Sequence, residues 1–160
     1  MHHRMRQVST TQTRYSSGGF SLIEVVVWVS LMGILAAFAL PRFTRVAHSA
    51  RAAEVAALSA NLRYAAEAAH VQYLASGRRQ TSVSVDRKII ELRNGYPDAS
   101  AGGIRNAVFD LDGFIIRSAD HEIIFAKSDA PTSERCSVRY HAAVESADSA
   151  VVSGLDTSGC

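Results

Sequence analysis

A long apolar block near the start of the chain dominates its pattern of hydrophobic and polar positions. From Phe20 to Leu40 only Ser21, Glu24 and Ser30 interrupt the apolar run. At about 1.5 Å per residue this block would form a helix roughly 31 Å long, close to the roughly 30 Å hydrocarbon core of a bilayer. A core helix of a soluble protein normally keeps a polar face, whereas this block is apolar on all sides. The block therefore predicts a membrane-spanning helix.

After Pro41 the pattern becomes that of an amphipathic helix. The residues up to Ser76 are rich in alanine, a strong helix former. Apolar side chains recur there at steps of three and four, at Val55, Leu58, Leu62, Ala65, Ala69 and Tyr73. Gly77 and the arginines after it are a helix stop signal. Residues 20–76 are therefore predicted to form one long helix in two halves, with a kink or interruption at Pro41.

The part of the chain beyond Gly77 changes to strand patterns and turn signals. Asn94-Gly95 followed by Tyr96-Pro97 indicates a turn, and residues 104–114 are compatible with a short helix. Together with the helix, the strands predict an α+β fold in which a small antiparallel sheet packs on the amphipathic half-helix. The predicted strands are Ser82–Val85, Lys88–Leu92, His121–Lys127, Cys136–Val144, where Cys136, Val138 and Tyr140 share one face, and a short one near Ala150–Val152.

Residues 1–19 have the composition of a targeting leader. They are polar, rich in serine and threonine, and contain Arg4, Arg6 and Arg14 but no acidic residue. The positive-inside rule places these arginines on the cytoplasmic side of the membrane. Removing the leader would lower the formal net charge of +2 by three, which leaves a slightly acidic chain. Net charge then gives no reason to expect general nucleic-acid binding.

Glu24 is an unexpected residue in the apolar block. An acidic side chain well inside a bilayer helix costs on the order of 2.5–3.5 kcal/mol on insertion scales, so a partner is implied. A positive charge at the same depth in the membrane would be a suitable partner. A free α-amino group, made by cutting the chain between Gly19 and Phe20, would provide that charge.

The two cysteines, Cys136 and Cys160, both lie in the last quarter of the chain. An even pair behind a membrane segment indicates one disulfide in an oxidising compartment. A loop of roughly 24 residues would stabilise a small domain by on the order of 3 kcal/mol in the entropic view. The alternative is two free thiols in a reducing compartment.

The apolar block resembles the N-terminus of type IV prepilins and the related pseudopilins. The resemblance rests on Gly19 before the cut, Phe20 as first mature residue, Glu24 as the fifth, the run Gly33–Ala37, and Pro41. It implies cleavage after Gly19 by a prepilin peptidase and N-methylation of Phe20. It also implies that the apolar helices pack in a filament core, where Glu24 faces the N-terminus of a neighbouring subunit.

Shorter motifs resemble the C-terminal pattern of mannose-sensitive-haemagglutinin-type pilins. They are NGYPDA at Asn94–Ala99, CSVRYHAA at Cys136–Ala143 and the ending SGC. The expected organisation is a cleaved leader (1–19), a transmembrane and filament-core helix (20–41), its amphipathic continuation (42–77) and a β head domain with a C-terminal disulfide loop (78–160).

This resemblance leads to the hypothesis of a structural subunit of a type IV pilus, with a role in adhesion, motility or surface attachment. Its expected partners are copies of itself, the prepilin peptidase, the inner-membrane assembly machinery and the membrane, with a surface ligand as a further possibility. The subunit would span the inner membrane once and then enter an extracellular pilus. The first alternative is a pseudopilin of a type II secretion system, although the cysteine pair favours a pilin.

A second alternative is a minor pilin that binds DNA or a glycan. Basic residues that could contact acidic ligands cluster after the helix, but Asp86, Glu91 and Asp98 interleave with them, which is typical of a solvated surface. The basic residues are Arg78, Arg79, Arg87, Lys88, Arg93 and Arg105.

The sequence shows no catalytic constellation, so we expect neither enzymatic activity nor a cofactor. The histidines do not have the spacing of a zinc site, so we expect no metal site. Asp110-Leu111-Asp112-Gly113 resembles part of a calcium loop, but the remaining ligands of an EF-hand are absent, and a solvated turn is the preferred interpretation.

Overall fold

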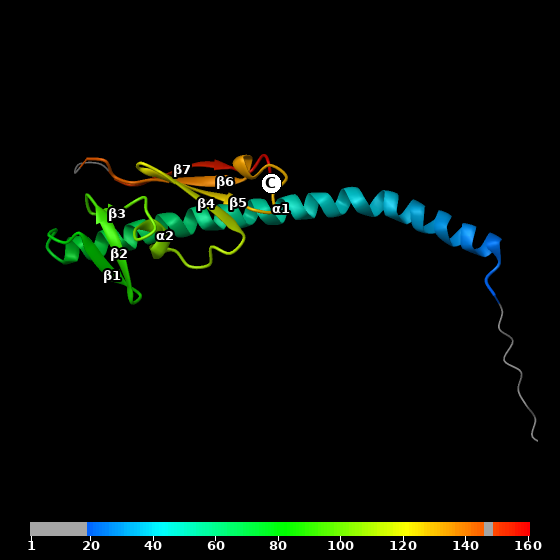
Figure 1. Ribbon diagram of the computed structural model, residues 1–160, viewed down its shortest axis with the longest axis horizontal. Helices are drawn as coiled ribbons and strands as arrows, with labels where there is room; N and C mark the ends of the chain where they lie inside the picture. Colours follow the sequence, from blue (N-terminus) through cyan, green and yellow to red (C-terminus); the bar gives the residue numbers. More distant parts are fainter. Residues whose placement is uncertain (1–18, 146–148) are drawn as a thin grey trace, which may run out of the picture. The chain divides into compact units, whose positions relative to one another are not determined.

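The chain has an α+β architecture in which one long helix is followed by antiparallel strands (Figure 1). The computed structural model describes residues 19–145 and 149–160. These residues belong to two compact units, one ending at Pro41 and one comprising Arg42–Cys160, which we call the head unit. The predicted fold class is confirmed.

Helix α1 (Leu22–Ala75) includes Pro41 without interruption. The predicted single long helix is therefore confirmed, and of the kink or interruption expected at Pro41 the interruption does not occur. The helix continues because a proline removes only one i to i−4 hydrogen bond, and the alanine and leucine residues before it are strong helix formers.

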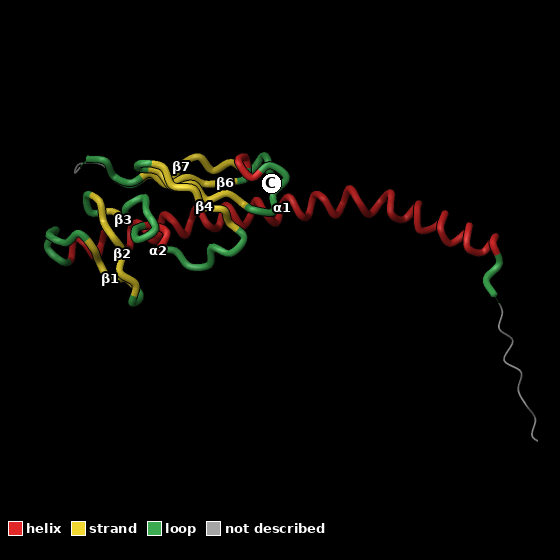
Figure 2. Tube along the Cα trace, viewed as in Figure 1, coloured by secondary structure: helices red, strands yellow, loops and turns green. Residues whose placement is uncertain are grey.

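The second half of α1 buries one face in the head unit. The predicted stripe is largely confirmed, since Val55, Leu58, Leu62 and Ala69 are buried, whereas Ala65 and Tyr73 are half-buried. Ala66 and Ser59 are also buried, and they widen the stripe. The two sheets lie along this half of the helix (Figure 2), and the buried residues of the stripe belong to the two core clusters of the head unit.

The first sheet has three strands in the order β1-β2-β3, namely β1 (Ser82–Val85), β2 (Lys88–Arg93) and β3 (Tyr96–Pro97). Both hairpin turns have two residues with positive φ, as type I′ turns require: Asp86-Arg87 at 48° and 66°, and Asn94-Gly95 at 51° and 85°. The predicted turn at Asn94-Gly95 is thus confirmed.

Tyr96-Pro97, however, belongs to a strand and not to that turn, so this part of the prediction is wrong. The two-residue turn brings Tyr96 opposite Arg93 and Pro97 opposite Leu92. A proline is tolerated there because β3 is an edge strand, where its missing N–H is not required by a further strand.

The second sheet has four strands in the order β4-β5-β6-β7. Three of them fall where strands were predicted. The short helix near 104–114 is only α2, and its last predicted residue, Phe114, begins β4, which the sequence analysis missed. The strands are β4 (Phe114–Ala119), β5 (Glu122–Lys127), β6 (Ser137–His141) and β7 (Val151–Asp156), and the short helical turns are α2 (Ile104–Ala107) and η1 (Ser133–Arg135). The head unit therefore contains two small sheets and not one.

Strand β6 connects the core to the first sheet. Val138, Tyr140 and the preceding Cys136 are fully buried on one face, as predicted, while Arg139 on the other face is exposed. The Tyr140 hydroxyl donates a hydrogen bond of 2.6 Å to the carbonyl of Pro97 in β3. Burial, and secondarily the charge of Asp98, raises the pKa of Tyr140 well above its ordinary value, so this donor stays protonated.

Candidate assembly surface on the apolar helix

The first half of α1 exposes its apolar side chains on every side. It is the segment long and apolar enough to cross a membrane within the described residues, and none of that window is buried. The exposed large apolar residues are Leu22, Ile23, Val25, Val26, Val27, Trp28, Val29, Leu31, Met32, Ile34, Leu35, Phe38 and Leu40. A contiguous apolar surface of this kind marks a membrane or protein interaction site.

Glu24 lies in the first turn of α1. Ser21 precedes the helix, and its carbonyl accepts a 3.1 Å hydrogen bond from the Val25 amide. Ser21 and Glu24 thus have the spacing of a capping box, in which a serine and an acid three residues later can satisfy helix N-terminal amides. The sequence analysis missed this motif, although the pattern S-x-x-E is visible in the sequence. Glu24 is also favoured there by the helix dipole.

Ser30 is the other polar side chain within the apolar helix. Its hydroxyl donates a 2.8 Å hydrogen bond to the carbonyl of Val26 one turn earlier. This bond satisfies the hydroxyl inside the helix, so Ser30 does not need a partner from outside. Glu24 remains as the single ionisable group between Phe20 and Leu40.

Gly19 and Phe20 precede the helix and lie outside regular secondary structure. Phe20 is 79% exposed, and there is open space around the Cα of Gly19. Exposed, non-helical peptides are preferred sites of proteolysis. The predicted cleavage site is therefore accessible, whereas the remainder of the predicted leader, residues 1–18, lies outside the described residues.

Cys136 and Cys160 form the predicted disulfide, which closes a sequence separation of 24 residues. Both cysteines are buried. Backbone hydrogen bonds hold the same loop, because the Gly159 amide donates to the Arg135 carbonyl at 2.8 Å and the Thr132 amide donates to the Gly159 carbonyl at 3.2 Å. The last residues of the chain are therefore fixed to the segment between β5 and β6.

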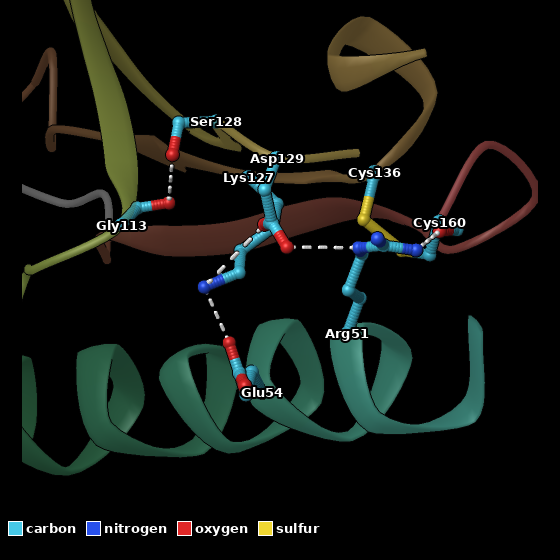
Figure 3. Close-up of polar contacts among 8 residues, drawn as sticks. All are labelled: Arg51, Glu54, Gly113, Lys127, Ser128, Asp129, Cys136 and Cys160. Carbon is cyan, nitrogen blue, oxygen red and sulfur yellow. Dashed lines mark hydrogen bonds and ion pairs between the residues drawn. A yellow bond between two sulfur atoms is a disulfide. The ribbon is translucent and has the colours of Figure 1, made fainter. Parts of the chain in front are cut away.

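Arg51 fixes this disulfide loop to α1 (Figure 3). Its guanidinium donates to the Cys160 carbonyl at 2.9 Å and to the Asp129 carboxylate at 3.0 Å. Lys127, only 9% exposed, contacts both Glu54 on α1 and Asp129. The hydrogen bond from Arg51, followed by the nearby positive charges, lowers the pKa of Asp129. The sequence analysis did not find this network, since a lysine at the end of a strand gives no signal of burial.

The basic residues after the helix differ in their contacts within the chain. Arg93 forms an ion pair of 2.6 Å with Asp98, and the Lys88 ammonium lies 3.8 Å from the centre of the Phe109 ring. Arg78, Arg79, Arg87 and Arg105 have no ion pair among the described residues.

The calcium-like segment is a turn between α2 and β4. Asp110 and Gly113 have positive φ of 57° and 79°, and no group of three or more potential metal ligands occurs within residues 19–145 and 149–160. Asp110 and Asp112 instead line a hollow beside α1 together with Phe109 and Phe114.

Comparisons with protein-family models, with curated proteins and with solved structures found no match to this chain.

Proposed function

We propose that this protein is the structural subunit of a type IV pilus. It is held in the inner membrane by the first half of α1 and is then transferred into an extracellular filament. Before assembly, a prepilin peptidase cuts after Gly19, and the new N-terminus at Phe20 is methylated. The role is structural and not catalytic: the filament serves adhesion, motility or surface attachment.

The observation that carries this proposal is the exposed apolar helix with a single acid near its start. Removing apolar surface from water is favourable by roughly 25 cal/mol per Å², and either lipid or other copies of the helix can do so. In lipid, Glu24 has no positive partner from a neighbouring copy, and it carries the cost expected for a charge in a membrane. Neighbouring copies supply an amine, so assembly removes a penalty that the bilayer leaves in place.

The contact between Glu24 and a neighbouring N-terminus also sets the register of the helices. Apolar side chains that are exposed on all sides give little directional preference, because burial by itself is not directional. A charged pair in a medium of low dielectric constant is strongly distance-dependent. The acid therefore selects one offset between neighbouring copies out of many that bury similar area.

The capping-box spacing suggests the variant that tests this role. Glutamine at position 24 retains the capping pattern but not the charge, whereas Ser21→Ala removes the cap and leaves the charge. If Glu24 pairs with an amine, Glu24→Gln should lower the yield of sheared filaments by roughly tenfold or more, the effect of losing one charged hydrogen bond. Ser21→Ala should keep most of the yield. Immunoblots of sheared and membrane fractions measure both.

Filament yield from Glu24→Gln equal to that of the wild type would contradict the proposal. A low yield from Ser21→Ala together with a normal yield from Glu24→Gln would assign Glu24 to helix capping alone. Electron microscopy of the wild-type protein distinguishes a pilin from the remaining alternative, a pseudopilin. Labelled surface filaments support a pilin, whereas labelling confined to the periplasm supports a pseudopilin of a type II secretion system.

A further inference from the structure

The head unit has a groove between α1 and the loop that precedes β4. Its first hollow, about 200 Å³, is lined by helix residues between Glu54 and Asn61 and by loop residues between Phe109 and Phe114. A second hollow of about 180 Å³ shares Asn61 and Phe109 and also reaches Tyr64. Each hollow is smaller than the 300–1,000 Å³ typical of small-molecule sites. The groove therefore suits side chains from another protein surface.

The loop wall of this groove is held in place by the rest of the head unit. Lys88 lies over the ring of Phe109 and donates a 3.4 Å hydrogen bond to the carbonyl of Val108. The Gly113 carbonyl accepts hydrogen bonds from both the amide and the hydroxyl of Ser128, each at 2.9 Å (Figure 3). The groove is thus formed before anything occupies it.

The rim of the groove is acidic. Glu54 is paired with Lys127 and is therefore largely neutralised. Asp110 and Asp112 are exposed, and neither forms an ion pair with any residue in the described part of the chain. A lining that includes two aromatic rings and two carboxylates without an ion pair favours an occupant that is both apolar and cationic.

The start of the head unit has the complementary surface. Phe43 and Val46 lie about one turn apart on α1 and are 75% and 63% exposed. Arg42 precedes Phe43 and Arg45 precedes Val46, and no acidic residue occurs between Arg42 and Glu54. Neither arginine forms an ion pair within residues 19–145 and 149–160.

This segment cannot occupy the groove of its own chain. Both surfaces belong to the same continuous helix, and Val46 lies roughly 12 Å before Glu54 along its axis. A second copy must supply the segment if the two surfaces are to meet. Because the two surfaces differ, such a contact is heterologous, and its repetition gives a ring if the rotation closes and an open helical array if it does not.

We propose that the segment Arg42–Val46 of one copy docks in the groove between α1 and the loop Phe109–Phe114 of the next copy. Phe43 enters the first hollow, and Arg42 and Arg45 face Asp110 and Asp112. The role of this contact rests on the proposed function, since it joins the head units of neighbouring subunits in the filament.

Photo-crosslinking of the full-length protein in its native membrane tests the contact directly. A benzophenone amino acid replaces Phe43, and mass spectrometry identifies the crosslinked peptides. The expected product is a dimer joined to the peptide that contains Phe109–Phe114. A probe at Ile89 in β2, which is similarly exposed at 66%, is the control and should not give this product.

Exchange of charges tests the pairing. Arg45→Glu and Asp112→Lys should each lower the crosslinked dimer by roughly fivefold, the upper range for an exposed ion pair. The two substitutions in one chain should restore it, because the pair is re-formed with opposite polarity. A double variant that gives no more crosslinked dimer than either single variant would overturn the proposal.

Adducts from position 43 to lipid alone would likewise overturn it and place the segment at the membrane surface. The outcomes also separate this inference from the proposed function. A specific dimer crosslink in cells without filaments would remove the filament role and leave the contact. Filaments that depend on Glu24 but show no crosslink from position 43 would remove the contact and leave the filament.

Discussion

The two halves of α1 both contain large apolar side chains but differ in what covers them. Leu35 in the first half is 61% exposed, whereas Leu62 in the second half is fully buried. The first half has apolar residues around its whole circumference, and the second half confines them to a stripe that includes Val55 and Ala69. One domain packed on one side of a helix can bury an apolar stripe. A helix that is apolar around its whole circumference needs partners on all sides to be buried.

This difference shows that residues 19–145 and 149–160 provide a core for only half of the helix. Ile123, Phe125 and Val138 from the second sheet complete the burial of Leu62 and its neighbours within the head unit. In the described residues before Pro41, no large apolar side chain is buried. The stability of the head unit and the assembly of the apolar helix are therefore expected to respond to different mutations.

The largest expected effect comes from truncating one leucine in each half of α1, which tests whether the two halves differ as described. Leu62→Ala should lower the free energy of unfolding of the head unit by about 2–5 kcal/mol, because a fully buried leucine leaves a cavity. Leu35→Ala should leave that free energy unchanged and lower only the yield of filaments. Pulse proteolysis in urea, on full-length protein in detergent, measures the fraction of head unit that is folded.

Leu35 would have to be assigned to the folded core if its truncation shifted the urea midpoint as Leu62→Ala does. Equal filament yields from wild type and Leu35→Ala, by contrast, would question the assembly role of the first half. The pair therefore tests both sides of the comparison with the same side chain.

The disulfide should have the next largest effect, again on the head unit alone. Replacing Cys136 and Cys160 by alanine should cost about 3 kcal/mol, the value expected for a closed loop of this length. The wild type in reductant should unfold at the same urea concentration as the double variant, and the double variant should be insensitive to reductant. A wild-type midpoint that reductant does not move would show that the loop is held by Arg51 and its backbone bonds alone.

Most of the fold could be predicted from the sequence because its signals are local. The helix period, the turn at Asn94-Gly95 and the alternation around Val138 depend on neighbouring residues, and each was found. Strand β4 was missed because Phe114-Ile115-Ile116 is a continuous apolar run, which periodicity cannot assign to helix or strand. Strand β3 was missed because Pro97 suggests a turn, and its strand geometry depends on pairing with Leu92.

The candidate site could be predicted only where it lies within one short segment. Gly19, Phe20 and Glu24 are close in sequence, so the hypothesis of a cleavage and assembly site could rest on their spacing alone. The Arg51 contact with Asp129 joins residues 78 positions apart, and a sequence gives no direct sign of such a meeting. The groove beside α1 was not predicted either. In the sequence Asp110 and Asp112 suggest only a turn or a calcium loop, because nothing there shows that they lie next to the helix.

The smallest expected effect concerns the ion-pair network, which holds the second half of α1 to the sheet. The pKa of Asp129 is lowered in the folded state, chiefly by its hydrogen bond from Arg51. The stabilisation is therefore present above the unfolded carboxyl pKa of about 3.9 and is lost as pH falls through the lower folded pKa. Asp129→Asn should be slightly less stable than the wild type at pH 7, and the two should converge toward pH 3.

Asp120→Asn is the matched control, because Asp120 is exposed and forms no ion pair among the described residues. Its urea midpoint should run parallel to that of the wild type at every pH. Some acid sensitivity should persist in Asp129→Asn, since hydrogen bonds from Ser158 also lower the pKa of Asp156. A gap between wild type and Asp129→Asn that stays constant from pH 7 to pH 3 would show that the asparagine acts through packing, and that the charge of Asp129 does not tie Arg51 and the helix to the head unit.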